Sequence, residues 1–238
     1  MKSGTAGAAR ALAAYSLALA TMLAGIASPA LAQVTVFLPT EGDLQATLAL
    51  PGDIKRGEYA YAECQTCHRR DGSGRAKFAM PRISGQHASV IIKQLMDIRS
   101  GLRVNEDMRE YMHDSDLTLQ DFADMAAYLE SLPVAGKIGQ GPPELVPRGQ
   151  ALYARDCAGC HGEHGEGLPE LFYPMLASQH FGYLLREIDL ILNGERGNSN
   201  PAMPPILQNY SADDKRAVAA YLAQLPAPGK TAAPDTPE

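Results

Sequence analysis

Two copies of one five-residue pattern contain all four cysteines of the chain: CQTCH at residues 64–68 and CAGCH at residues 157–161. In this pattern two thiols three positions apart can form thioethers with both vinyl groups of one haem, while the adjacent histidine ligates the iron. A zinc site would use four Cys or His ligands and would not explain a histidine directly after each pair. A thioredoxin-like CxxC would need a βαβ setting, of which the sequence shows no sign. We therefore predict two covalent haems, attached through Cys64, Cys67, His68, Cys157, Cys160 and His161. No thiol then remains for a disulfide, a catalytic cysteine or a cysteine axial ligand.

Each iron also needs a sixth ligand, and the thioether of methionine suits haem iron and raises its potential. After the second motif we favour Met203, which lies in the polar segment NPAMP, over its rival Met175. After the first motif the position 93 residues before Met203 holds Glu110, which cannot serve. There we favour Met108, with Met112 and then His113 as alternatives. Methionines of this kind can simply fill a core, but these ones stand in segments that we expect to be polar loops.

Other residues near the motifs are expected to support the haems. Pro81 and Pro174 each follow a motif histidine by 13 residues and can offer a backbone carbonyl to its Nδ1–H, a contact that fixes the orientation of the ring. His87 and His180 also correspond at an offset of 93. We interpret these two as polar residues near a helix start.

The 93-residue offset continues well beyond the motifs, for instance from Gln86 to Gln179 and from Arg103 to Arg196. The chain therefore contains two homologous units of about 80 residues. Apolar residues recur at helical spacing at the end of each unit, over 122–129 and 218–225, after the cap-like residues Thr118 and Ser211. Apolar runs over 91–98 and 183–191 predict a middle helix in each unit. Because alternating strand patterns are scarce, we predict an all-α fold.

The expected organisation follows from these repeats and from the ends of the chain. Residues 1–32 carry two basic residues, a short apolar stretch and then ALA, so we predict an export signal cleaved after Ala32. No later segment is apolar enough to span a membrane. We predict a signal peptide at 1–32, an N-terminal extension without a clear account at 33–52, a first repeat at 53–133, an extended linker at 134–147, a second repeat at 148–226 and a mobile tail at 227–238.

Charge excludes some partners and suggests others. The whole chain has 21 Lys and Arg against 27 Asp and Glu, which argues against nucleic acid as the main partner. Residues 69–82 carry a net charge of +4, whereas the matching residues 162–175 carry −3. If both loops border haem edges, the opposite signs would steer different redox partners to the two haems, with an acidic partner at the first repeat.

The chain resembles the dihaem cytochromes of the cytochrome c4 family. The resemblance covers residues 53–226 and rests on CQTCH and CAGCH, on MPRISGQH and YPMLASQH, on GLRVNEDM and GERGNSNPAM, and on the two terminal helices. It implies two tandem class I cytochrome c domains related by approximate two-fold symmetry, each wrapped around one covalent haem. It also implies the ligand pairs His68 with Met108 and His161 with Met203. Ser178 departs from the family, which has glycine at that position.

The function expected from the motifs and the resemblance is electron transfer in the periplasm, one electron per haem. The donor would be a quinol-oxidising membrane complex or a dehydrogenase, and the acceptor a terminal oxidase or reductase. Six-coordinate iron leaves no open site, so we expect a carrier without catalytic residues and not an enzyme. The mature chain would lack a transmembrane segment, and a peripheral position at the membrane surface stays open. The alternative is the electron-accepting dihaem subunit of a dehydrogenase complex, such as a flavocytochrome sulfide dehydrogenase. A dihaem peroxidase or thiosulfate dehydrogenase fits less well, because peroxidases are longer and the latter enzymes use a cysteine ligand.

Overall fold

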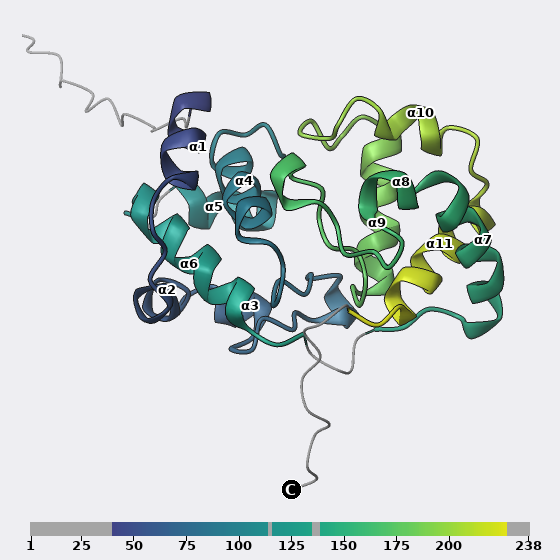
Figure 1. The fold of residues 1–238 in the computed structure, drawn as a ribbon, viewed down its shortest axis with the longest axis horizontal. Helices are drawn as coiled ribbons and strands as arrows, with labels where there is room; N and C mark the ends of the chain where they lie inside the picture. Colours follow the sequence, from purple (N-terminus) through teal and green to yellow (C-terminus); the bar gives the residue numbers. More distant parts are fainter. Residues whose placement is uncertain (1–39, 114–115, 135–138, 228–238) are drawn as a thin grey trace, which may run out of the picture. The chain divides into compact units, whose positions relative to one another are not determined.

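The computed structural model describes residues 40–113, 116–134 and 139–227, all of which fall in one compact unit that spans Phe37–Glu238. The predicted signal peptide and most of the predicted tail lie outside the described residues. The described residues form helices, and isolated bridges pair Arg75 with Met80 and Leu168 with Tyr173. The prediction of an all-α fold is confirmed (Figure 1).

Each repeat contains the same succession of helices. The first repeat has α2 (Ile54–Ala60), α3 (Gln65–His68), η1 (Ala76–Phe78), α4 (Ala88–Arg99), α5 (Glu106–His113) and α6 (Leu119–Ser131). The second has α7 (Val146–Asp156), α8 (Ala158–His161), η3 (Pro169–Leu171), α9 (Phe181–Leu192), α10 (Met203–Leu207) and α11 (Ala212–Gln224). The linker holds one short 3-10 helix, η2 (Pro143–Leu145). The expected middle and terminal helices are therefore present in both repeats.

The terminal helices begin where the sequence predicts. The hydroxyl oxygens of Thr118 and Ser211 accept hydrogen bonds from the amides of Asp121 and Asp214, whose carboxylates in turn accept from the two cap residues. Such capping boxes satisfy amides that the first turn of a helix leaves without partners. Pro133 and Pro226 follow the last turns, at positions that cannot continue a helix.

The first and last helices of each repeat cross in close contact. A Cβ atom added at Gly57 of α2 would lie 2.0 Å from the carbonyl oxygen of Asp124 in α6, and Gly149 of α7 stands in the same relation to Ala217 of α11. Both crossings are flanked by a tilted tyrosine pair, with ring centroids 5.6 Å apart in the first repeat and 5.5 Å in the second. Glycine is thus required at both crossings for the backbones to meet.

Part of the N-terminal extension, for which the sequence offers no account, is a helix. α1 (Glu41–Leu48) begins at a capping box of Thr40 and Asp43 and packs against α4 and α6 (Figure 1). Its Leu44 and Thr47 are buried, and Leu44 belongs to the core of the first repeat. The extension therefore enlarges that core, a feature without a counterpart in the second repeat.

Reciprocal hydrogen bonds join the two repeats. Gln86 donates to the carbonyl of Met175 and accepts from its amide, and 93 residues later Gln179 makes the same two bonds with Arg82, at 2.8–3.0 Å. In an isologous interface, as in a two-fold symmetric dimer, each contact occurs twice, once in each direction between equivalent residues. The predicted approximate two-fold relation of the repeats is confirmed by these contacts.

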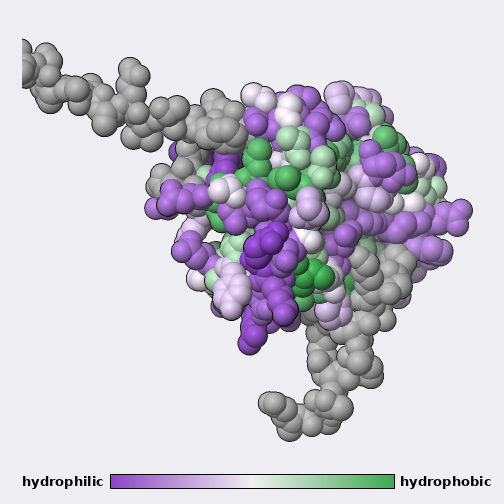
Figure 2. Space-filling view, turned by 60° about the vertical axis from the view of Figure 1, so that its left-hand side comes forward, coloured by the Kyte–Doolittle hydropathy of each residue, from purple (hydrophilic) through white to green (hydrophobic). Residues whose placement is uncertain are grey.

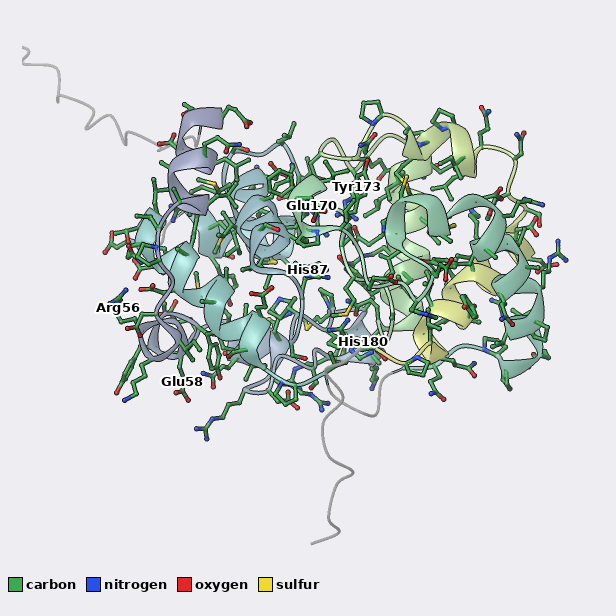
Figure 3. The ribbon with its side chains drawn as sticks, in the orientation of Figure 1. Arg56, Glu58, His87, Glu170, Tyr173 and His180 are labelled. Carbon is green, nitrogen blue, oxygen red and sulfur yellow. The ribbon has the colours of Figure 1, made fainter. Side chains whose placement is uncertain are left out.

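His87 and His180 take part in the same interface. They occupy the N-cap positions of α4 and α9, near the helix starts as expected, and lie between the repeats (Figure 3). The Nε2 atom of His87 is 2.7 Å from the carbonyl oxygen of Glu166, and that of His180 is 2.8 Å from the carbonyl oxygen of Ser73. His180 Nδ1 also accepts from the amide of Gly139 in the linker. Sequence reasoning found the helix starts but not this bridging role.

Arg82 does not belong to the surface charge counted for residues 69–82. It is only 1% exposed, and its guanidinium donates to the carbonyls of Ser84, Ala177 and Ser178. Burial lowers its pKa to about 10. Its charge is therefore directed at the interface and does not add to the surface of the loop.

Candidate functional site

The two CxxCH motifs occupy equivalent places. In each, the first cysteine precedes a four-residue helix, α3 or α8, that ends on the motif histidine. His68 and His161 are buried, and their Nδ1 atoms lie 3.1 and 3.3 Å from the carbonyl oxygens of Pro81 and Pro174. The predicted contact of each proline carbonyl is confirmed. Since Nδ1–H donates to a carbonyl, the lone pair of Nε2 is left available for a metal.

The surroundings keep both imidazoles neutral, the form that binds iron. Burial is the main cause that lowers the pKa of His68 and of His161. The positive charge of Arg103 acts in the same direction on His68, and that of Arg196 on His161. Burial also raises the thiol pKa of Cys64 and Cys157 to about 11. This burial disfavours the thiolates that a zinc site would need.

The four cysteines line the same cavity as the methionines that the sequence singles out. A cavity of about 1400 Å³ is lined by Cys64, Cys67, His68, Met108 and Met112 from the first repeat and by Cys157, Cys160, His161, Met175 and Met203 from the second. In the part of the chain that the structure describes, no group of three or more His, Cys, Asp and Glu could hold a bare metal ion. Each motif thus shares this cavity with at least one methionine of its own repeat.

The methionines do not stand in loops, as the sequence led us to expect. Met108 and Met112 lie one turn apart on α5, and Met203 is the first residue of α10. In α5 the difference arises because Asn105 precedes the helix and its side-chain oxygen accepts from the amide of Met108 at 3.3 Å. Asparagine caps helix starts in this way, so a polar residue that suggested a loop instead begins a helix. Asn200 accepts from the amide of Ala202, the residue before α10, at 2.9 Å.

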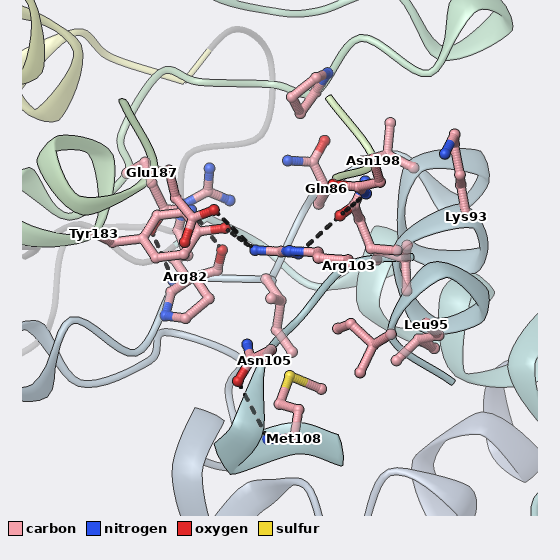
Figure 4. A pocket seen from close by; sticks show the side chains of 18 of the residues that line it. Arg82, Gln86, Lys93, Leu95, Arg103, Asn105, Met108, Tyr183, Glu187 and Asn198 are labelled. Carbon is pink, nitrogen blue, oxygen red and sulfur yellow. Dashed lines mark hydrogen bonds and ion pairs between the residues drawn. The ribbon is translucent and has the colours of Figure 1, made fainter. Parts of the chain in front are cut away.

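The rival methionines differ in their packing. Met112 is 2% exposed and belongs to the core of the first repeat, whereas Met108 packs at the edge of that core with its sulfur beside Asn105 in the cavity (Figure 4). Met175 is 4% exposed, and its backbone is held by Gln86. The side chain of His113, the third alternative, lies outside the described residues.

The chemistry of the cavity fits haem. Each haem carries two propionate carboxylates, and each repeat contributes one largely buried guanidinium to the cavity, Arg103 and Arg196. The hydroxyl of Ser199, which also lines the cavity, is buried without a hydrogen-bond partner in the described protein. Buried polar groups normally have a partner, so Ser199 indicates a missing acceptor or donor. These three residues would hold the propionates, and the bound haem supplies one-electron chemistry at its iron.

Comparison with known proteins agrees with this geometry. A family model described as Cytochrome c matches residues 54–133, and one described as cytochrome c oxidase, cbb3-type, subunit III matches residues 144–222. A crystal structure of reduced recombinant cytochrome c4 from Pseudomonas stutzeri superimposes with a TM-score of 0.66 at 28% identity, over 73% of this chain and 99% of that one. The fold and the two sites define a c-type cytochrome with two haem domains, and two covalent c-type haems are its cofactors.

Sequence relatives then give the family. Cytochrome c4 of Pseudomonas aeruginosa is 31% identical over 184 residues, which cover 73% of this chain and 89% of the relative. A thiosulfate dehydrogenase electron acceptor of Stutzerimonas stutzeri is 30% identical, over 80% of this chain and 96% of the relative. The chain belongs to the cytochrome c4 family, and it is a dihaem electron-transfer protein.

Proposed function

We propose that this cytochrome is a mobile periplasmic carrier whose haems are ligated by His68 with Met108 and by His161 with Met203. The observation that carries the proposal is the shared cavity, in which each buried neutral histidine is joined by a methionine at a helix start of the same repeat. With one histidine and one methionine from each repeat as its ligands, the iron would serve electron transfer and would offer no position for a substrate. The two basic residues, the short apolar stretch and the ALA sequence within residues 1–32 support export. Among the described residues, none of the helices is both long and apolar enough to cross a bilayer.

The ligands are tested by replacing each methionine singly with alanine. The oxidised protein should show the methionine-to-iron charge-transfer band at the red end of its spectrum, from both haems. Met108→Ala and Met203→Ala should each remove about half of that band, whereas Met112→Ala should keep it and lower only the stability. Loss of half of the band in Met112→Ala, with the full band in Met108→Ala, would assign the first ligand to Met112.

The first repeat offers a basic surface to a partner. Arg69, Arg70 and Lys77 are exposed after the first motif, whereas Arg75 folds back on the carbonyl oxygen of Thr66. In the second repeat the corresponding loop exposes Glu163 and Glu170. Figure 2 shows a band of hydrophilic side chains beside hydrophobic spots on the face that turns toward the viewer. We place an acidic redox partner at the basic loop, because opposite charges steer encounter at low salt.

Charge reversal tests this docking site. The triple variant Arg69→Glu, Arg70→Glu, Lys77→Glu should slow electron transfer to an acidic partner at low salt, and the difference from the native protein should shrink as salt is added. A matched variant, Glu163→Lys with Glu170→Lys, should leave that partner's rate unchanged. Equal rates for the native protein and the triple variant at low salt would remove the first repeat as the docking site.

A second candidate function is a subunit of a dehydrogenase complex. It is favoured by the relative from Stutzerimonas stutzeri, whose name makes it the electron acceptor of a thiosulfate dehydrogenase. The native mass of the haem-stained species in a gently prepared periplasmic extract separates the two functions. A free chain with two haems supports the carrier, and a stable complex with a larger redox subunit supports the dehydrogenase.

A further inference from the structure

The segment that carries the methionines of α5 is arranged differently from its counterpart in the second repeat. Met108 stands ten positions before the cap residue Thr118, whereas Met203 stands eight positions before Ser211. The terminal helices themselves keep the constant offset of 93. The contacts that hold the methionine segment of the first repeat must therefore be its own.

A buried arginine at the end of α4 makes such contacts. Arg99 is 6% exposed, and it donates from Nε to the carbonyl oxygen of Met112 at 3.1 Å and from Nη1 to that of Leu117 at 2.8 Å. Its guanidinium also lies over the ring of Phe122, 4.5 Å from the centroid. Met112 belongs to α5, and Leu117 directly precedes the cap residue of α6. Arg99 therefore ties the methionine helix to the helices on either side of it in the sequence.

The additional helix α1 packs against the same frame. It contacts α4 and α6, the two helices between which Arg99 holds the methionine segment (Figure 1). Leu44 of α1 belongs to one core cluster with Met96 of α4, Met112 of α5 and Phe122 of α6. Each of these four side chains is less than 9% exposed. The cluster thus joins α1 to the helix that carries the methionines.

The second repeat is built differently at the same positions. Leu192 stands where the first repeat has Arg99. Asp189 and Lys215 stand where the first repeat has the buried Met96 of α4 and Phe122 of α6, and these two charged side chains form an ion pair. Burial of such charges under an apolar helix face is costly. The apolar residues of α4 and α6 are therefore matched to the cover that α1 provides in the first repeat.

We infer that Arg99 is a positioning residue which, together with α1, holds α5 so that a methionine thioether stays on the iron of the first repeat. A foreign ligand binds a six-coordinate iron only in the fraction of molecules whose methionine has moved away, so its apparent affinity falls with that fraction. Arg99 keeps the fraction small, because a shift of α5 that withdraws the methionine breaks the bond to the Met112 carbonyl. The inference rests on the proposed ligation by a methionine of α5, and it holds whether that ligand is Met108 or Met112.

The test is a titration of the oxidised haem-loaded protein with imidazole, which replaces methionine on haem iron and removes the methionine-to-iron band. Arg99→Leu introduces the side chain that the second repeat has at this position. It should increase the affinity of the first-repeat haem for imidazole about tenfold, which corresponds to about 1.4 kcal/mol. The second-repeat haem should stay within about twofold of its native affinity, since Arg99 has its contacts in the first repeat.

The two haems are followed separately in backgrounds that lack one methionine ligand. In Met203→Ala the remaining band reports on the first repeat. In whichever of Met108→Ala and Met112→Ala loses half of the band, the remainder reports on the second repeat. Failure of the proposed ligation therefore shows in these methionine variants before imidazole is added, whereas failure of the present inference shows only in the titration.

A second variant approaches α5 from α1. Leu44→Ala leaves the side chain of Arg99 in place but opens a cavity in the shared core, and it should increase the imidazole affinity of the same haem by about threefold or more. The matched controls are Gln45→Ala on the exposed face of α1 and Arg109→Leu, which removes an exposed arginine from α5 itself. Both controls should stay within about twofold of native.

Native affinity of the first-repeat haem in Arg99→Leu would overturn the inference, and so would an equal increase at both haems. Native affinity in Leu44→Ala would overturn the role of α1. If Arg99→Leu does not retain both haems, Leu44→Ala decides alone.

Discussion

The crossing of α2 and α6 at Gly57 leads to a quantitative prediction for Gly57→Ala. The added Cβ atom would lie 2.0 Å from the carbonyl oxygen of Asp124 and 2.8 Å from Cβ of Tyr128, where ordinary contacts begin at 3.4 Å. The obstacle is mainly backbone, which cannot turn away as a side chain can. The two helices would therefore have to separate by about 1.4 Å at their closest point.

Such a separation weakens the whole crossing. A gap of up to 1 Å already forfeits a quarter to a half of the dispersion energy of the atoms that face it. Overpacking of a core costs about 1–3 kcal/mol, and we expect about 3 kcal/mol here. For a domain of this size, that lowers the melting temperature by roughly 10 °C or more. The assay is thermal unfolding of the haem-loaded protein followed by far-ultraviolet circular dichroism.

The control for this prediction is Gly42→Ala in α1. There the added atom would meet only Thr40 Oγ1, at an ordinary 3.5 Å, and alanine is the better helix former. The control should melt at or above the native temperature. If Gly57→Ala melted within about 2 °C of the native protein, the helices would tolerate a side chain at the crossing and our reading of the interface would be refuted.

Three further predictions concern single side chains. Burial lowers the pKa of His180, so the unfolded chain takes up a proton at this residue before the folded chain does. The contribution of His180 to stability is therefore present above about pH 6.5 and is lost as the pH falls. Chemical unfolding between pH 7 and 5 should show this loss in the native protein and less of it in His180→Gln. Arg69 has φ 62° and ψ 164°, a region that favours glycine, which stands at the equivalent Gly162; Arg69→Gly should therefore raise the free energy of unfolding by about 1 kcal/mol in urea titrations, and a lower value would contradict the strain. Asp124 is 1% exposed and accepts from Arg56 at 2.6 Å; Asp124→Ala should lower the free energy of unfolding by about 2–3 kcal/mol, measured in the same titrations, and an unchanged value would show that the bond contributes nothing.

Much of the site could be predicted because its chemistry is local in sequence. The cysteines and the histidine of each motif are within five positions of one another, and the proline carbonyl that orients each ring comes 13 residues later. Repetition at a constant offset added the helices and their caps. Where the spacing of residues in the chain determines their distance in the fold, as in a short helix or a capping box, the sequence was sufficient to predict the contact.

What could not be predicted depends on contacts between distant segments. Arg82 was counted as a surface charge because its three carbonyl partners, two of them about 95 residues away, leave no mark on the sequence nearby. The same holds for His180, which reaches Ser73 across the interface. The helical placement of Met108 was missed for another reason, since asparagine favours loops and helix caps alike.

Departures from the repeat locate what distinguishes the two haem sites. The motif helices, the proline carbonyls and the helix crossings are the same in both repeats, so they cannot make one haem differ from the other. The repeats differ inside at Gln94 and Glu187 and at Asp97 and Leu190, and outside where the exposed Arg70 and Lys77 correspond to Glu163 and Glu170 of the second loop. The outer charges then assign a different partner to each haem, because the basic loop of the first repeat would receive an acidic acceptor. A donor of opposite charge would then dock at the second repeat.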